Sequence, residues 1–331
     1  MDVATYGDWL YGSSCGVLVL ALVFLLVEQA WGRHTVAAAA GRRRQARELL
    51  TVGGGPSHDA PAGGAAAGPP ESVGSGRPAP ARAERVGRMG VALTVLATGL
   101  LAAALVCRAA ATGRPPWGNM HEYVAALCLV GLVTWLIMLR RYPIRHLTGF
   151  LLLPLTVLMF VGGTALYVPA GPVVPALQSY WLFIHVAAAI LGSGILLVPG
   201  TASALYLVRE PFERGSTRFA GFARRLPAAE VLDRLAYRLT IVAFPVFTFG
   251  VICGAIWAEA AWGRYWGWDP KETVSFIMWI VLAAYLHSRA TAGWRARRAA
   301  VINVTAWAMG VFNLFFVNLV VTGLHSYAGV G

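Results

Sequence analysis

Eight apolar stretches, each close to the length that crosses a lipid bilayer, dominate this chain. They cover about residues 11–30, 90–111, 122–139, 147–167, 181–208, 239–258, 273–289 and 300–322. A transmembrane helix needs roughly 20 mostly apolar residues. Lipid cannot form hydrogen bonds with the backbone N–H and C=O groups at the open edge of a strand, so such stretches are expected to be helices. The sequence therefore predicts an all-α polytopic integral membrane protein with about eight transmembrane helices.

The distribution of charge predicts the orientation of these helices. Only 13% of the residues are charged, and the net charge is +12. Most of the 27 basic residues fall in alternate connections, above all in 32–89 and 209–238. Basic loops stay in the cytoplasm, so both termini are expected outside. This placement points to the membrane surface, and no nucleic-acid partner is expected.

The chain divides into three parts. Residues 1–31 form the N-terminal transmembrane helix, and residues 90–331 form the main membrane domain. Between them, 32–89 is rich in Gly, Ala, Pro and Arg, which predicts a disordered basic cytoplasmic loop. Within the main domain, 209–238 is either an amphipathic surface helix or a connector. The four cysteines fall in predicted helices without a CxxC pair, so we interpret them as small apolar residues.

Four of the 12 tryptophans lie close together before the seventh apolar stretch. They are Trp257, Trp262, Trp266 and Trp268, and the last three belong, with Tyr265, to the segment WGRYWGWDPKET. An aromatic belt at the membrane interface accounts for scattered tryptophans but not for this density. We therefore expect a flat aromatic surface that packs against a flat hydrophobic ligand such as a porphyrin.

The second half of this segment has the pattern of a helix start. Asp269 stands at the N-cap position, Pro270 at the first helical position and Glu272 at the third, which predicts a capping box. We interpret Asp269 and Glu272 as structural first. Lys271 and Arg264 are candidate cations for ligand carboxylates such as propionates.

Three histidines are candidate iron ligands. His185 lies roughly 7 Å from the outer end of its helix, and His325 follows the last helix at the same face. His287 lies near the inner face. Neutral imidazole is a common axial ligand of haem iron. His185 and His325 could share one iron, whereas His287 would need a second ligand from His146 or from a partner protein; the alternative for each histidine is a structural role at the interface.

One further polar segment precedes the third apolar stretch. Asn119 is placed to cap that helix, with Glu122 at its third position. His121 could bind a metal, but it has no partner at helical spacing. We therefore rank it behind the other three histidines.

Five segments together resemble the CcsA (ResC) family of cytochrome c biogenesis proteins, called CcsB in actinobacteria and known for a tryptophan-rich WWD signature. The segments are PALQSYWLFIHV, GAIWAEAAWG, WGRYWGWDPKET, AAYLHSRA and GLHSYAG. They stand in the family's order between residues 114 and 331. The WWD motif corresponds to residues 257–273, and the first helix and the long loop are poorly matched.

The resemblance implies a haem-handling protein of the system II maturation pathway in the bacterial plasma membrane. It implies that His185 and His325 flank haem b, bound as substrate, at the outer tryptophan platform. It also implies that His287 serves an inner haem site completed by a ResB-type partner. The protein would be part of a holocytochrome c synthase (haem lyase) complex that acts on apocytochrome c. A thiol-reducing thioredoxin-like protein is a further candidate partner.

Two other functions remain open at this point. The first is a dihaem cytochrome b-type electron carrier, but such proteins carry paired histidines on the same helices, and no predicted helix here has two. The second is a transporter of haem or another anion without ligation chemistry. No side chain in these motifs resembles a catalytic nucleophile or general base. The expected role of the protein is therefore to position haem.

Overall fold

The computed structural model describes residues 2–52, 79–172, 179–291 and 296–325, and the secondary structure in these ranges is helical. The helices are α1 (Val3–Val52), α2 (Ala79–Thr112), α3 (Met120–Arg141), the 3-10 turn η1 (Arg145–Leu147), α4 (Thr148–Thr164), α5 (Tyr180–Glu213), α6 (Ala220–Ala223), α7 (Ala229–Trp262), α8 (Pro270–Ala290) and α9 (Ala296–Leu319). Within the described residues, eight helical segments are long and apolar enough to cross a membrane. The predicted all-α polytopic class is therefore confirmed.

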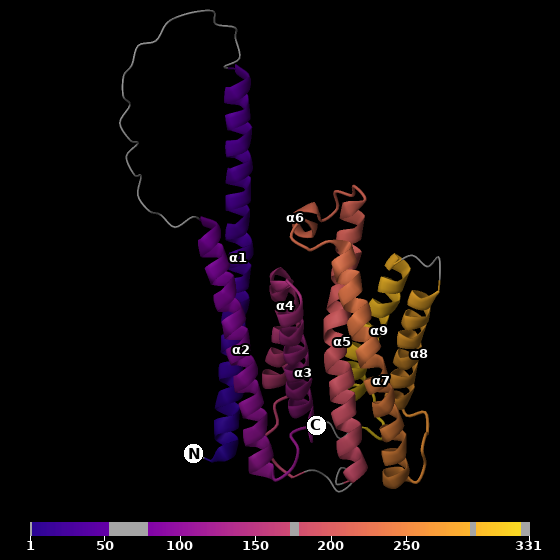
Figure 1. The fold of residues 1–331 in the computed structure, drawn as a ribbon. Helices are drawn as coiled ribbons and strands as arrows, with labels where there is room; N and C mark the ends of the chain where they lie inside the picture. Colours follow the sequence, from indigo (N-terminus) through magenta and orange to yellow (C-terminus); the bar gives the residue numbers. More distant parts are fainter. Residues whose placement is uncertain (1, 53–78, 173–178, 292–295, 326–331) are drawn as a thin grey trace, which may run out of the picture.

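The helices form a row of packed layers (Figure 1). α1 and α2 pair on one flank, α3 and α4 lie beside them, and α5, α7, α8 and α9 form the other half, with α3 packed against α5. The α2–α3 and α7–α8 connections lie at the same end as the start of α1, as do the end of α4 and the start of α5 (Figure 1). We call this the motif end, because the α7–α8 connection carries WGRYWGWDPKET. The opposite end, which carries α6, is called the arginine end.

Several helices are longer than the apolar stretches that predicted them. α5 and α7 have 34 residues each. α1 continues to Val52 and α2 begins at Ala79, so both helices enter the predicted 32–89 loop, whose residues 53–78 lie outside the described ranges. Segment 209–238 is divided among three elements: 209–213 end α5, 229–238 begin α7, and the connector 214–228 between them contains the short α6. It forms no single amphipathic surface helix, and Ala223 and Leu226 of the connector are buried.

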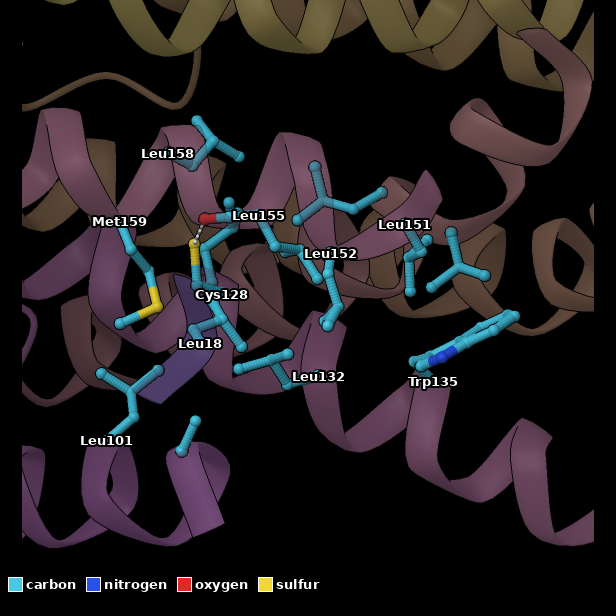
Figure 2. Close-up of a cluster of buried hydrophobic side chains, with 14 of the residues drawn as sticks. Leu18, Leu101, Cys128, Leu132, Trp135, Leu151, Leu152, Leu155, Leu158 and Met159 are labelled. Atoms are coloured by element: carbon cyan, nitrogen blue, oxygen red, sulfur yellow. Dashed lines mark hydrogen bonds between the residues drawn. The ribbon is translucent and has the colours of Figure 1, made fainter. Parts of the chain in front are cut away.

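A leucine-rich core lies between α3 and α4 (Figure 2). Cys128 on α3 is fully buried beside Leu132, Leu152 and Leu155, with its sulfur 3.9 Å from the carbonyl oxygen of Leu155. Cys128 thus packs as the small apolar residue that its position predicted. In the other half, Gly192 lets α5 approach α7, because a Cβ there would lie 2.9 Å from the backbone of Phe247.

A buried ionic network joins α1, α2 and α3 at the motif end. The Glu122 side chain is 0% exposed and pairs with Arg114 at 2.8 Å and with Arg108 at 3.4 Å. Arg108, 2% exposed, also pairs with Asp8 of α1 at 2.9 Å. Asn119 caps α3 as predicted, accepting from the Glu122 backbone N–H at 2.9 Å. The predicted reciprocal bond from the Asn119 backbone N–H to the Glu122 carboxylate does not form. The carboxylate instead accepts from Arg108, Arg114 and the Gly118 backbone N–H, because the buried guanidinium groups are strong partners.

We expect Glu122→Gln to destabilise the folded protein by about 3–5 kcal/mol, because it leaves a buried arginine charge without its anion. Chemical unfolding in detergent measures this change. The matched control is Glu84→Gln, which breaks the exposed Glu84–Arg88 pair at 3.0 Å and should cost only about 0.3–0.5 kcal/mol. Equal stability losses in the two variants would show that the network contributes nothing beyond a surface ion pair.

Candidate functional site

A cavity of about 220 Å³ opens in the half of the bundle that contains the motif. Its walls come from α3, α4, α5, α7, α8 and α9, from the loops before α3 and between α7 and α8, and from His325 after α9. On α5 the lining runs from Leu182 to Leu197, which is roughly 22 Å of helix. The deep end is mostly apolar, with Leu127, Met278 and Trp307 among its residues. The polar groups gather towards the motif end.

His185 of α5 forms one wall of this cavity. Its Nδ1 bonds the carbonyl oxygen of Gly250 at 2.8 Å, and its ring stacks on Trp257 at a centroid distance of 6.0 Å and an interplanar angle of 7°. The ring lies against Gly254 of α7, where an added Cβ would stand 2.7 Å from two ring atoms. Glycine at this position therefore gives His185 the room it occupies.

His325, which follows α9, forms the second imidazole of the cavity wall. Its Nδ1 lies 2.7 Å from Oδ2 of Asp269, while Oδ1 of the same carboxylate accepts from the backbone N–H of Leu324 at 2.8 Å. Burial lowers the pKa of His325 to about 4, so the ring is neutral at physiological pH. Burial raises the pKa of Asp269, but its hydrogen bonds with Leu324 and His325 outweigh that effect and keep it below its usual value.

The two imidazoles have the same tautomer and share a tryptophan. In each ring Nδ1 faces an oxygen acceptor, so Nδ1 carries the proton and Nε2 carries the lone pair that can bind a metal. His325 meets Trp257 at 5.9 Å and Trp262 at 5.1 Å, both edge to face. The structure thus brings together His185, His325 and the first two motif tryptophans, as the predicted depths of the histidines suggested.

The remaining motif aromatics form a separate group. Trp266 lines the cavity, whereas Trp268 is 64% exposed and does not, and the two rings meet at 89°. Both also contact Phe276 of α8 edge to face. Tyr265 lines the cavity mouth and is 62% exposed. The expectation of one flat aromatic surface is wrong for this structure, because the chain leaves α7, turns at a positive φ and enters α8 within the motif.

The predicted start of α8 is confirmed. Asp269 and Glu272 form the capping box, with Pro270 at the first position of the helix. Lys271 lines the cavity and donates from Nζ to Oδ1 of Asn318 at 2.6 Å. Arg264 instead lies 3.9 Å from Glu272 and is not among the lining residues. Of the two candidate cations, only Lys271 therefore faces the cavity.

Four buried polar atoms of the cavity wall lack a hydrogen-bond partner among the described residues. They are Nε1 of Trp117, Nε1 of Trp307, Oε1 of Glu272 and Oδ1 of Asn313. Buried polar atoms are normally satisfied, so this wall is built to meet polar groups of a ligand or water. Trp117 and Asn313 were not predicted as site residues, and nothing in the sequence near them signals that they reach the same cavity as His185.

The other histidines lie elsewhere. His287 is exposed on α8 towards the arginine end and does not line the cavity. His146 lies in η1 beside α4, which packs against α1 and α3, whereas α8 packs against α7 and α9, so the fold separates the two (Figure 1). His121 is buried with Nδ1 2.7 Å from the carbonyl oxygen of Gly162, between Tyr11 and Tyr167.

These observations define a multi-pass membrane protein whose cavity joins two imidazoles to a tryptophan-rich wall. A family model described as cytochrome C assembly protein matches residues 117–325, and the chain belongs to this family. The matched range contains every cavity residue from Trp117 to His325. It leaves out α1 and α2.

Known relatives are similar over most of the chain. The cytochrome c biogenesis protein CcsA of Gloeobacter violaceus is 35% identical, with 70% of this chain and 82% of the relative aligned. CcsA of Parasynechococcus marenigrum is also 35% identical, over 71% of this chain and 85% of the relative. Among solved structures, the cytochrome c haem lyase CcmF has a TM-score of 0.61 at 17% identity, which shows a shared fold. The match covers 95% of this chain and 47% of CcmF, so the chain spans about half its length.

Proposed function

We propose that this protein acts in cytochrome c maturation of the system II type, as part of a haem lyase complex. In this proposal it receives haem and presents it to apocytochrome c at the motif end. The observation that carries the proposal is the convergence of His185 and His325 on Trp257 at the polar end of an apolar cavity. The relatives named as cytochrome c biogenesis proteins support it.

The cavity residues suit haem. His185 and His325 each offer an Nε2 lone pair, and their Nδ1 atoms are held by the Gly250 carbonyl and the Asp269 carboxylate, the outer-shell arrangement that orients metal-binding histidines. Apolar side chains line the deep part of the cavity, and the unpartnered donor of Trp117 faces it. An apolar wall with a few placed polar groups is typical of sites for cofactor-sized ligands.

The contribution of the chain would be to position the substrate. Haem supplies the vinyl groups that are joined to the cysteine thiols of apocytochrome c. His185 and His325 would bind the iron through Nε2, with their rings fixed by their Nδ1 hydrogen bonds. Trp257 and Trp262, which contact these rings, would exclude water from the iron. Fixing a reacting group in one orientation removes much of the entropic cost of the reaction. No acid or base from this chain is required by the proposal.

A second site is proposed at the other side of the membrane. His287 is exposed on the surface of α8, and no second imidazole of the described chain is placed beside it. We propose that a ResB-type partner supplies the second ligand there, and that haem b passes from this site to the cavity. The motif end would then face outwards from the bacterial plasma membrane.

The absorption spectrum of the purified protein tests the proposal. We expect the full-length protein, isolated in detergent with its membrane partner, to carry b-type haem with a bis-histidine spectrum. Two bis-histidine haems that quinol reduces would instead indicate a dihaem electron carrier. A protein that is folded but takes up no haem, even when haem is added, would contradict the proposal.

A further inference from the structure

Lys271, the single lysine of the sequence, occupies an unusual position in the cavity wall. It stands in the first turn of α8, and its amine donates one hydrogen bond, to Oδ1 of Asn318 on α9 at 2.6 Å. The Asn318 amide is itself fixed, because its Nδ2 donates to the carbonyl oxygen of Leu314 at 2.7 Å. An ammonium group has three N–H donors, so two remain for a ligand.

The acidic groups near Lys271 make their hydrogen bonds with other residues, and Oε1 of Glu272 has no hydrogen-bond partner among the described residues. The Asp269 carboxylate bonds His325 and the backbone of Leu324. Oε2 of Glu272 accepts from the backbone of Gly267 at 2.8 Å, and Arg264 lies 3.9 Å away. Within the part of the chain that the structure describes, no ion pair forms at the Lys271 amine. Burying an ammonium group without a paired anion is costly, so a lysine at this position indicates an anion that arrives with the ligand.

We propose that Lys271, held by Asn318, binds a carboxylate of the cavity ligand. This inference rests on the proposed function, in which the ligand is haem, and the carboxylate is then one of its propionates. The two propionates lie on one edge of the porphyrin, and the vinyl groups lie on the far side of the ring. Binding a propionate at the α8–α9 wall therefore turns the vinyl groups away from that wall, and Lys271 selects one orientation of the substrate.

Haem and its dimethyl ester, in which both propionates are esterified, test this assignment. The full-length protein in detergent is titrated with each compound, and binding is followed by absorbance. We expect wild type to prefer haem by about tenfold or more, which is the scale of a charge-assisted hydrogen bond. Lys271→Met is expected to bind haem as weakly as wild type binds the ester. Lys271→Arg should keep most of the preference.

Arg264→Gln is the matched control, because it removes a cation of the same motif that does not line the cavity. It is expected to prefer haem as strongly as wild type does. Two results would overturn the inference: no preference in wild type, or an equal loss of affinity for both compounds in Lys271→Met, which would give Lys271 a purely structural role. If folded wild type binds neither compound, the proposed function fails, and this inference fails with it.

Discussion

Replacing either His185 or His325 with alanine is expected to reduce holocytochrome c to background while the membrane protein itself still accumulates. Each substitution removes one of the two imidazoles that meet at Trp257, and neither neighbouring tryptophan offers a metal-binding atom. His185 packs beside Gly254, so alanine leaves a small void without disturbing a buried ion pair. The measurement is haem staining of c-type cytochromes in cells that depend on each variant.

His146→Ala is the control for this pair of variants. Its ring is exposed in η1, and its hydrogen bond to Gln29 uses the backbone carbonyl oxygen, which the substitution keeps. We expect normal cytochrome levels in this variant. Normal levels of c-type cytochromes in both His185→Ala and His325→Ala would contradict the proposed function, because the cavity histidines would then be dispensable.

Asp269→Ser is expected to weaken haem binding by about 10–100-fold without unfolding the protein. Serine is also a good N-cap residue, so α8 keeps its start. The change removes the carboxylate that bonds Nδ1 of His325 at 2.7 Å. Loss of such an outer-shell partner typically costs 10–100-fold in metal affinity. Titration of the purified variant with haem measures the affinity, and its melting temperature reports on the fold.

Asp269→Asn separates the two bonds of this carboxylate. The amide oxygen can still accept from the backbone of Leu324, but the negative partner of His325 is lost. We expect an affinity between those of wild type and Asp269→Ser. Wild-type affinity in the serine variant would rule out the positioning role. If the serine variant has a lower melting temperature as well as a lower haem affinity, the effect belongs to the helix cap and not to the positioning of His325.

The sequence predicted local features of the site well. The spans followed from apolar length, and the caps at Asn119 and Asp269 followed from residue type at a helix start. Depth along a helix was enough to place His185 near the motif tryptophans, because rise per residue is fixed. These features depend on near neighbours in the chain, which sequence patterns report directly.

The features that the sequence did not predict are contacts between distant segments. Asp269 and His325 are 56 positions apart, and Lys271 and Asn318 are 47 apart. Helical periodicity carries no information on which helices pack together, so the role of Asn318 was invisible. The same is true of Glu122, whose capping position was predicted but whose ionic partners come from other segments.

The ionic network at the motif end also bears on how the chain enters the membrane. Translation delivers Asp8 first, then Arg108 and Arg114, and finally Glu122. Arg108 thus finds Asp8 already present, and Glu122 finds both of its arginines, so neither of these two charges enters the apolar phase without a partner. The α1–α2 hairpin, which lies outside the family match, would therefore guide the assembly of the bundle. α3 can pack at the motif end only after Arg108 of α2 is in position to pair with Glu122.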